Sequence, residues 1–184
     1  MVRTGLDLRH GRKAFFLCKG KFNRPELELE IYRVDNSHKK RVWDIFSKYH
    51  YLNNELHAAS LQYVGILNGE LVCHTGLIQF PMQKGKKRVH RLVVLPDYQG
   101  IGIGTAFISK VAEMIDKSGY EVNLTTTTPA LVGALKRNPH WILARYGRAK
   151  ENFKRFQNRY GLELKHLDNQ ASGKRITYSF WFKR

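Results

Sequence analysis

Alternating glycines follow a short apolar run and lead into a segment with helical periodicity. Residues 92–95 are apolar, Pro96 ends the run, and Gln99 is followed by Gly100, Gly102 and Gly104. Glycine permits positive φ angles, so neighbouring backbone N–H groups can turn toward one anion, and a helix N-terminus adds partial positive charge. The pattern predicts a loop that binds a pyrophosphate through backbone amides, without a lysine.

Two other nucleotide-binding loops do not fit this spacing. A Walker A loop needs Gly-Lys followed by Ser or Thr, whereas Thr105 follows Gly104 directly. A dinucleotide-binding loop needs GxGxxG and an acidic residue at the end of the next strand, whereas Glu121 stands at the start of that strand. A tight turn without a ligand is the remaining alternative, and the strand and helix around the glycines disfavour it.

The periodicity of apolar residues predicts the elements that position this loop. An Asn68-Gly69 pair predicts a hairpin turn between two of the strands. One strand–loop–helix–strand unit among hairpin-like connections indicates a mixed α/β fold. Strands are expected at residues 28–34, 61–67, 71–80, 88–95, 120–126 and 176–182, helices at 36–51, 103–117, 129–137 and 150–160, and an apolar segment at 141–146.

The run from His90 to Thr105 resembles motif A of the GNAT superfamily of acetyltransferases, whose loop reads Gln/Arg-x-x-Gly-x-Gly/Ala. Gln99, Gly102 and Gly104 match that loop in position. The resemblance is strong over residues 88–118. It implies a mixed α/β fold with a mainly antiparallel, twisted sheet flanked by helices and a splayed central strand pair. A basic arm, residues 1–26, would precede an acyltransferase domain, 27–184, with a basic extension from about 147.

The resemblance also implies acetyl-CoA, or another acyl-CoA, as the cosubstrate. Its pyrophosphate would lie on the backbone of residues 99–105 and its pantetheine along the end of the preceding strand. The N–H of Val94 would polarise the thioester carbonyl, as in an oxyanion hole. The cofactor-binding residues expected on this basis are Leu92, Val93, Val94, Gln99, Gly100, Ile101, Gly102, Ile103, Gly104 and Thr105.

Acyl transfer to an amine needs a group that accepts a proton and a group that protonates the leaving thiolate. His90 is the expected base, because imidazole titrates near neutrality and the family often carries a glutamate nearby; a structural histidine is the alternative. The family's usual acid is a tyrosine, but Lys136 stands at that position. Tyr146 or solvent would replace it. His50 and His57 lack a third ligand at metal spacing, so no metal site is expected.

The segment that follows the first helix borders the acceptor in the resembled family. It holds aromatic and amide side chains that can stack on, or hydrogen-bond to, a base or ring. Simple packing is the alternative. The expected acceptor-binding residues are His50, Tyr51, Asn53 and Asn54.

The net charge of +17 is concentrated at the two ends of the chain. Residues 1–27 carry seven Lys/Arg against two acids, residues 28–133 twelve against ten, and residues 134–184 thirteen against three. Such a distribution attracts polyanions, although an acidic protein partner or a merely soluble basic surface would fit it too. The nucleic-acid contacts expected on one helix are Lys150, Lys154, Arg155 and Arg159.

Composition sets the remaining expectations. No run approaches the ~20 apolar residues of a membrane helix, and the two cysteines form no CxxC pair, so a reduced, cytoplasmic setting without membrane contact is expected. The function expected is an acyl-CoA-dependent N-acyltransferase whose amine acceptor lies on, or is bound to, nucleic acid: tRNA, aminoacyl-tRNA or a DNA base. The alternatives are a nucleic-acid-binding module that has lost catalysis and a small-amine acetyltransferase.

Overall fold

The computed structural model describes residues 14–18, 27–50, 55–148 and 176–184. The chain forms two compact units, one up to Val122 together with Arg184 and the other from Asn123 to Lys183. Each unit combines strands with at least one helix, and the strand pairs described within them are antiparallel. The expected mixed α/β class with a mainly antiparallel sheet is confirmed.

The first unit contains five antiparallel strands that neighbour one another in chain order. Asn68 and Gly69 have φ angles of 50° and 80°. These positive values suit the tight hairpin predicted between the third and fourth strands. The strands are β1 (Ala14–Cys18), β2 (Leu27–Arg33), β3 (Leu61–Leu67), β4 (Glu70–Gln79) and β5 (Lys86–Val94).

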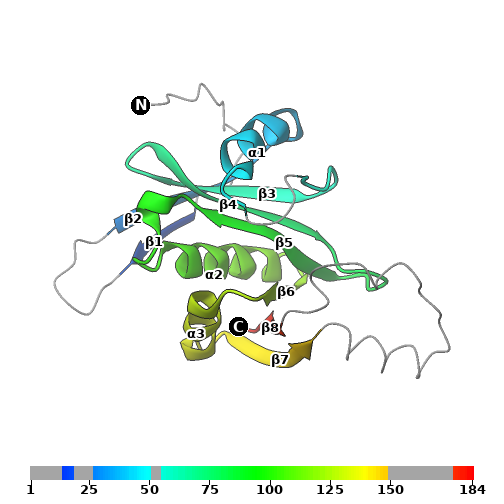
Figure 1. Cartoon of the computed structure of the whole chain (residues 1–184). Helices are drawn as coiled ribbons and strands as arrows, with labels where there is room; N and C mark the ends of the chain where they lie inside the picture. The colour runs from blue at the N-terminus through cyan, green and yellow to red at the C-terminus, as the bar shows by residue number, and fades with distance from the viewer. Residues whose placement is uncertain (1–13, 19–26, 51–54, 149–175) are drawn as a thin grey trace. The chain divides into compact units, whose positions relative to one another are not determined.

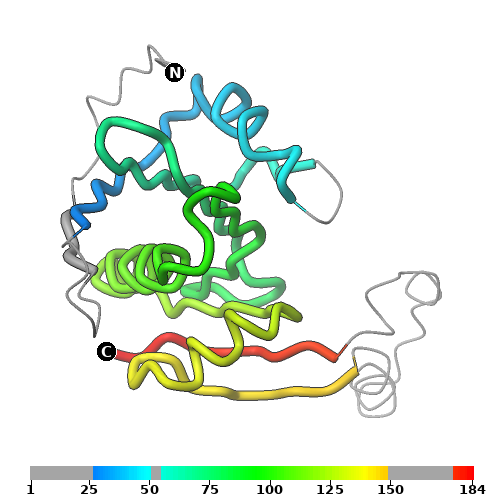
Figure 2. The backbone as a smooth tube through the Cα atoms, turned by 60° about the vertical axis from the view of Figure 1, so that its left-hand side comes forward, coloured from blue at the N-terminus to red at the C-terminus, as the bar shows by residue number. Residues whose placement is uncertain are grey.

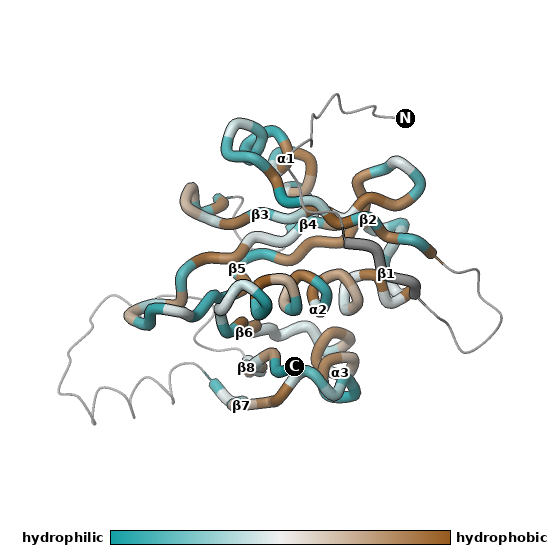
Figure 3. Tube along the Cα trace, turned by 180° about the vertical axis from the view of Figure 1, so that it is seen from behind, coloured by the Kyte–Doolittle hydropathy of each residue, from teal (hydrophilic) through white to brown (hydrophobic). Residues whose placement is uncertain are grey.

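Two helices cover opposite faces of this sheet, α1 (Lys39–Ser47) on one side and α2 (Ile103–Asp116) on the other (Figure 1). On the α1 side, Val42 and Phe46 are fully buried and pack with Val93 of β5. Figure 3 shows hydrophobic residues gathered along α2 and the strands. Two short 3₁₀ turns, η1 (Asn36–His38) and η2 (Pro96–Tyr98), precede α1 and α2.

The second unit holds the remainder of β6 (Glu121–Thr126), then α3 (Pro129–Arg137), β7 (Trp141–Arg148) and β8 (Ile176–Phe182). Strand β8 pairs antiparallel with both β6 and β7, and Figure 2 shows β7 and β8 running side by side. Phe180 is fully buried, and the rings of Trp141 and Phe182 meet edge to face at 5.3 Å. This unit therefore has an aromatic core.

The elements predicted from the sequence agree with the structure to within a few residues. Helix α1 ends at Ser47 and not at residue 51, because Lys48 caps it and Tyr49 and His50 continue as a turn. The apolar segment at 141–146 is β7. The helix expected at 150–160 lies outside the described residues.

Two expectations about organisation stay predictions. Residues 14–18 of the expected N-terminal arm pair as β1 with β2, and the rest of the arm lies outside the described residues. The expected splayed strand pair would be β5 and β6. Strand β5 belongs to the first unit and most of β6 to the second, so the splay stays a prediction. None of the helices in the described part of the chain is long and apolar enough to span a membrane.

Candidate cofactor and acceptor site

The glycine loop, residues 99–105, adopts backbone angles that favour glycine. Gly100 and Gly102 have φ angles of 79° and 93°, a region that other residues enter only with strain. The side chain of Gln99 donates from Nε2 to the carbonyl oxygen of Val94 at 2.8 Å. That hydrogen bond ties the loop back to the end of β5.

Helix α2 begins without a side-chain cap. Gly102 is its N-cap residue, and the N–H of Ala106 donates to the Gly102 carbonyl at 3.1 Å. The amides of Ile103, Gly104 and Thr105 therefore precede the intrahelical ladder and carry the partial positive charge of the helix N-terminus. This arrangement suits a pyrophosphate.

Gly104 lies against the end of the strand that precedes the loop. A Cβ added at Gly104 would come within 3.0 Å of Cγ2 of Val94, closer than side-chain carbon atoms normally approach. Because Gly104 has no side chain, the first turn of α2 can pack directly against β5. The positive φ angles and the uncapped start of α2 fit an acyl-CoA pyrophosphate, and Gly104 allows the close packing that holds α2 against the strand end.

The strand end also directs an amide away from the neighbouring strand. The N–H of Leu95 donates to the carbonyl of Val72 on β4 at 2.9 Å. Amides alternate in direction along an extended chain, so the N–H of Val94 points to the other edge of β5. This is the amide that the family resemblance assigns to the thioester carbonyl.

His90 occupies a β-bulge. Gly76 of β4 pairs with Arg91 and Leu77 pairs with Val89, which leaves His90 as the extra residue between them. Bulges of this kind redirect side chains and are common beside active sites. The bulge changes which residues of β5 share a face.

The residues of β5 that face α1 can be identified from their pairing partners on β4. His74 belongs to that face, because its ring stacks on Phe46 of α1 at 5.4 Å between centroids. Alternation puts Gly76 and Ile78 on the same face. Their cross-strand partners there are Val93 for His74, Arg91 for Gly76 and Arg88 for Ile78. Two arginines thus flank the histidine bulge.

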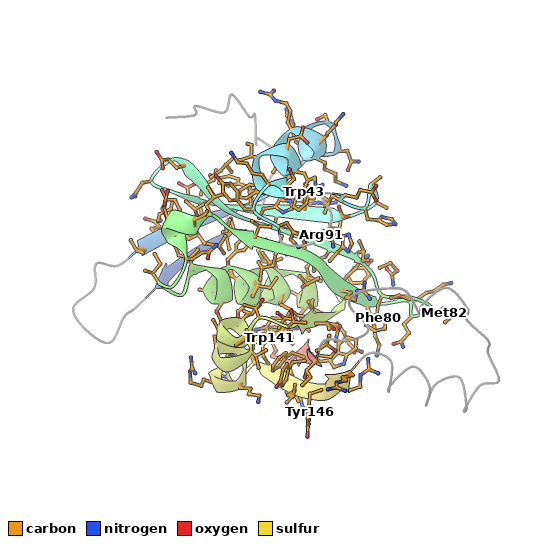
Figure 4. The ribbon with its side chains drawn as sticks, viewed as in Figure 1. Trp43, Phe80, Met82, Arg91, Trp141 and Tyr146 are labelled. Carbon is orange, nitrogen blue, oxygen red and sulfur yellow. The ribbon has the colours of Figure 1, made fainter. Side chains whose placement is uncertain are left out.

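Arg91 is a buried arginine, 7% exposed, that joins the bulge to the segment after α1. Its guanidinium donates to the carbonyl of His90 at 3.0 Å and to the carbonyl of Glu55 at 2.9 Å. Figure 4 shows Arg91 and Trp43 on the side of the sheet that carries α1. The Arg91 side chain therefore fixes residues 55–57 beside His90.

Burial and positive neighbours keep the histidines of this region neutral. The pKa of His90 is lowered to about 4, mainly by burial and then by Arg91, Arg88, His57 and His50. The pKa of His50 is also lowered to about 4, by burial and Arg91. The expectation that His90 titrates near neutrality was wrong, because the sequence did not reveal its burial beside two arginines.

Of the other predicted catalytic and acceptor-binding residues, His50 lies near His90, whereas Tyr146 belongs to the second unit. His50 follows α1, with its ring centroid 5.9 Å from that of Trp43. Tyr146 belongs to the second unit, where it is 69% exposed and stacks on Tyr178 at 6.1 Å, and Lys136 Nζ lies 5.2 Å from the Tyr178 ring centroid. The predicted residues outside the described ranges are Tyr51, Asn53, Asn54, Lys150, Lys154, Arg155 and Arg159.

Sequence reasoning missed the two arginines. Arg88 and Arg91 lie on either side of His90 in a strand whose second half is apolar, and their place beside the histidine was the available signal. Within the described ranges, no group of three or more His, Cys, Asp or Glu side chains is arranged to hold a metal ion.

A family model describing the acetyltransferase (GNAT) family matches residues 26–136. The chain belongs to the GNAT acetyltransferase family. The match includes β2 to β5, the glycine loop and α2, so it spans the candidate site. As a family member, the chain is an acyl-CoA-dependent N-acetyltransferase with acetyl-CoA as its usual cosubstrate. No curated protein sequence gives a significant match.

Solved structures share the fold of this acetyltransferase at low sequence identity. An IAA acetyltransferase from Bacillus cereus is 15% identical with a TM-score of 0.57, over 85% of this chain and 99% of that one. The ribosomal-protein-S18-alanine N-acetyltransferase from Escherichia coli is 14% identical with a TM-score of 0.57, over 84% and 92%. A Bacillus subtilis acetyltransferase in complex with CoA is 12% identical with a TM-score of 0.55, over 86% and 99%. At these identities the likeness establishes the fold alone.

Proposed function

We propose that this acetyltransferase transfers an acetyl group from acetyl-CoA to an amine that lies on, or is bound to, nucleic acid. The observation that carries the transfer is the uncapped start of α2 behind two positive-φ glycines, tied by Gln99 to the strand end. Acetyl-CoA supplies the activated acetyl group. The chain's own residues bind it, orient it and move the proton.

The glycine loop binds the pyrophosphate through the amides of Ile103, Gly104 and Thr105. The N–H of Val94, on the edge of β5 away from β4, donates to the thioester oxygen as negative charge develops there. A preorganised backbone donor of this type lowers the barrier without reorganising during the reaction.

His90 accepts a proton from the attacking amine as a neutral imidazole. With its pKa near 4, it is a weak base, so it acts once attack on the carbonyl has made the nitrogen acidic. Its contribution is then smaller than that of a base matched to neutral pH. Solvent protonates the leaving thiolate in this proposal, and the role of Tyr146 as an alternative acid stays a prediction from the family resemblance.

The nucleic-acid part of the proposal is supported by a basic, aromatic surface on the second unit. Tyr146 and Tyr178 pair across β7 and β8, and Arg148 lies two residues along on the same face. Lys136 and Arg145 are exposed on the same unit. Exposed aromatic rings beside cations stack on unpaired bases and neutralise phosphates. The nucleic-acid contacts predicted at Lys150, Lys154, Arg155 and Arg159 lie outside the described residues and stay predictions.

A cytoplasmic location is part of the same proposal. Cys73 is buried with a free thiol, which suits a reducing compartment.

Two rival functions are separated by one experiment. A binding module without catalysis is favoured by Lys136 at the usual tyrosine position and by the weak base. A small-amine acetyltransferase is favoured if nucleic acid is not bound. The protein is incubated with labelled acetyl-CoA and one acceptor at a time: tRNA, single-stranded DNA or a free amine. The label should appear on the nucleic acid or on an amine bound to it. Label on free amines alone supports the second rival, and CoA binding without any label supports the first.

A further inference from the structure

Arg88 is a partly buried cation without a counter-ion. It lies opposite Ile78 on the α1 face of β5, and burial lowers the pKa of its guanidinium. Among the residues that the structure describes, no carboxylate pairs with it and no hydrogen bond forms to it. A guanidinium that is partly shielded from water attracts an incoming anion more strongly than a fully exposed one does.

Other cations of the same unit have carboxylate partners. Lys86 pairs with Glu121 at 3.1 Å, and Lys110 pairs with Glu113 at 3.0 Å. Arg184 pairs with Asp116 at 2.6 Å. Arg88 differs from these three cations, because it is partly buried and no described carboxylate pairs with it.

His90 lies two residues from Arg88 on β5, so the charges around His90 also bear on an anion at Arg88. The bulge brings His90 to the same region, and Arg91 holds the backbone of Glu55, two residues before His57. The cations that lower the pKa of His90 are Arg91 and Arg88, and no carboxylate acts on it to raise that pKa. Such a site does not favour an ammonium group. It favours an oxyanion.

We propose that Arg88 binds an oxyanion of the acceptor, either a carboxylate or a phosphate, while the amine of the same molecule faces His90 and the acetyl group. This inference rests on the proposed acetyl transfer and adds the chemical class of the acceptor. A guanidinium binds carboxylate and phosphate in a two-pronged geometry, which also fixes orientation. Acceptors then include α-amino acids, their conjugates and phosphorylated amines.

The distance between Arg88 and His90 limits how far apart the amine and the oxyanion of the acceptor can be. Arg88 and His90 are two residues apart on one strand, or roughly 7 Å along the backbone. An amine and an oxyanion separated by a few bonds can contact both side chains. A long polyamine offers no group for Arg88.

The first test compares acceptors that differ only in the oxyanion. Phenylalanine is set against phenethylamine, and O-phosphoethanolamine against ethanolamine, with acetyl-CoA saturating. In the wild type, kcat/KM should be at least ten-fold higher for the member that carries the oxyanion in at least one pair. A preference in the phenylalanine pair indicates a carboxylate, and a preference in the phosphoethanolamine pair indicates a phosphate. Arg88→Gln should remove the preference through KM.

The matched control is Lys87→Gln, which removes one charge from the adjacent position. Lys87 Nζ donates to Gln79 at 3.0 Å and lies 4.7 Å from the Tyr120 ring centroid, in a different environment. Its variant should keep the preference. Equal rates for both members of each pair in the wild type, or a preference that survives Arg88→Gln, would overturn the inference and leave acetyl transfer intact.

A binding measurement separates this site from the activity. Inorganic phosphate and acetate are titrated into the CoA-bound protein, and the imidazole resonances of His57 and His90 are followed by NMR. Saturable shifts with one of the anions, lost in Arg88→Gln and kept in Lys87→Gln, support the site even if no amine is acetylated. Wild-type resonances that do not move with either anion contradict it.

Discussion

The side chain of Gln99 donates a hydrogen bond to the carbonyl oxygen of Val94 at 2.8 Å. One residue thus joins the loop expected to bind pyrophosphate to the strand end expected to polarise the thioester. The glycines give the loop its backbone angles, but this hydrogen bond sets its position relative to β5. The two halves of the cofactor site are therefore coupled through a single side chain.

Gln99→Ala should weaken acetyl-CoA binding because the loop loses this restraint. One hydrogen bond contributes about 0.5–1.5 kcal/mol, or roughly a two- to twelve-fold rise in Kd, measurable by calorimetry. Gln79→Ala is the matched control, since its amide also donates to a backbone carbonyl, that of Gln83 at 2.6 Å in the β4–β5 hairpin. Equal affinities in the two variants would remove Gln99 from the cofactor site.

The pKa of His90 is testable directly. An NMR titration of its imidazole should give a midpoint near 4, because burial and Arg91 disfavour the imidazolium. Arg91→Gln removes a positive neighbour and should move the midpoint upward, toward the ordinary value of about 6.5. A wild-type midpoint near 6.5 would contradict the burial of His90 beside the arginines.

His74 should make the folded state sensitive to acid. Its ring is fully buried, Nε2 lies 3.1 Å from the side-chain oxygen of Gln62, and its pKa is lowered to about 3. The unfolded chain binds the proton first, so stability is complete above about pH 6.5 and declines as the pH falls toward 3. Urea unfolding should show a loss of up to about 1.4 kcal/mol per pH unit from this group. His74→Leu should flatten that slope. An unchanged slope would mean that other groups cause the pH dependence of the unfolding free energy.

The basic surface of the second unit should carry nucleic-acid affinity. Reversing the charge at Lys136, Arg145 and Arg148 should weaken binding to single-stranded RNA or DNA and flatten its salt dependence, by roughly 0.7 in log–log slope per lost phosphate contact. Reversal at Lys39, Lys40 and Arg41 of α1, which makes the same change in net charge, is the control. If the wild type binds neither nucleic acid at low salt, the acceptor is not on nucleic acid.

Local patterns allowed much of the cofactor site to be predicted. The alternate glycines, the proline before them and the helical periodicity after them lie within a short stretch, and the structure has the loop and α2 where these residues predict them. The Asn68-Gly69 turn could likewise be predicted from two adjacent residues. Short-range backbone preferences were sufficient at these positions.

The acceptor side depends on contacts that no local pattern contains. The bulge at His90 is visible only from the register of β5 on β4, and the hydrogen bond from Arg91 to Glu55 joins residues far apart in the chain. The low pKa of His90 follows from those contacts, so a neutral-pH base was the wrong expectation.

The central claim is acetyl transfer from acetyl-CoA bound at the glycine loop. The most direct measurement is mass spectrometry of reactions that contain carbon-13-labelled acetyl-CoA and tRNA, single-stranded DNA or the amine pairs above. Gly102→Asp, which adds bulk and negative charge where the anion binds, and Gly85→Asp, which makes the same change at a distant positive-φ turn, serve as the matched variants. The account predicts a labelled acetyl-amine with the wild type and Gly85→Asp, and none with Gly102→Asp. Failure of the wild type to acetylate any acceptor, or full transfer by Gly102→Asp, would contradict it.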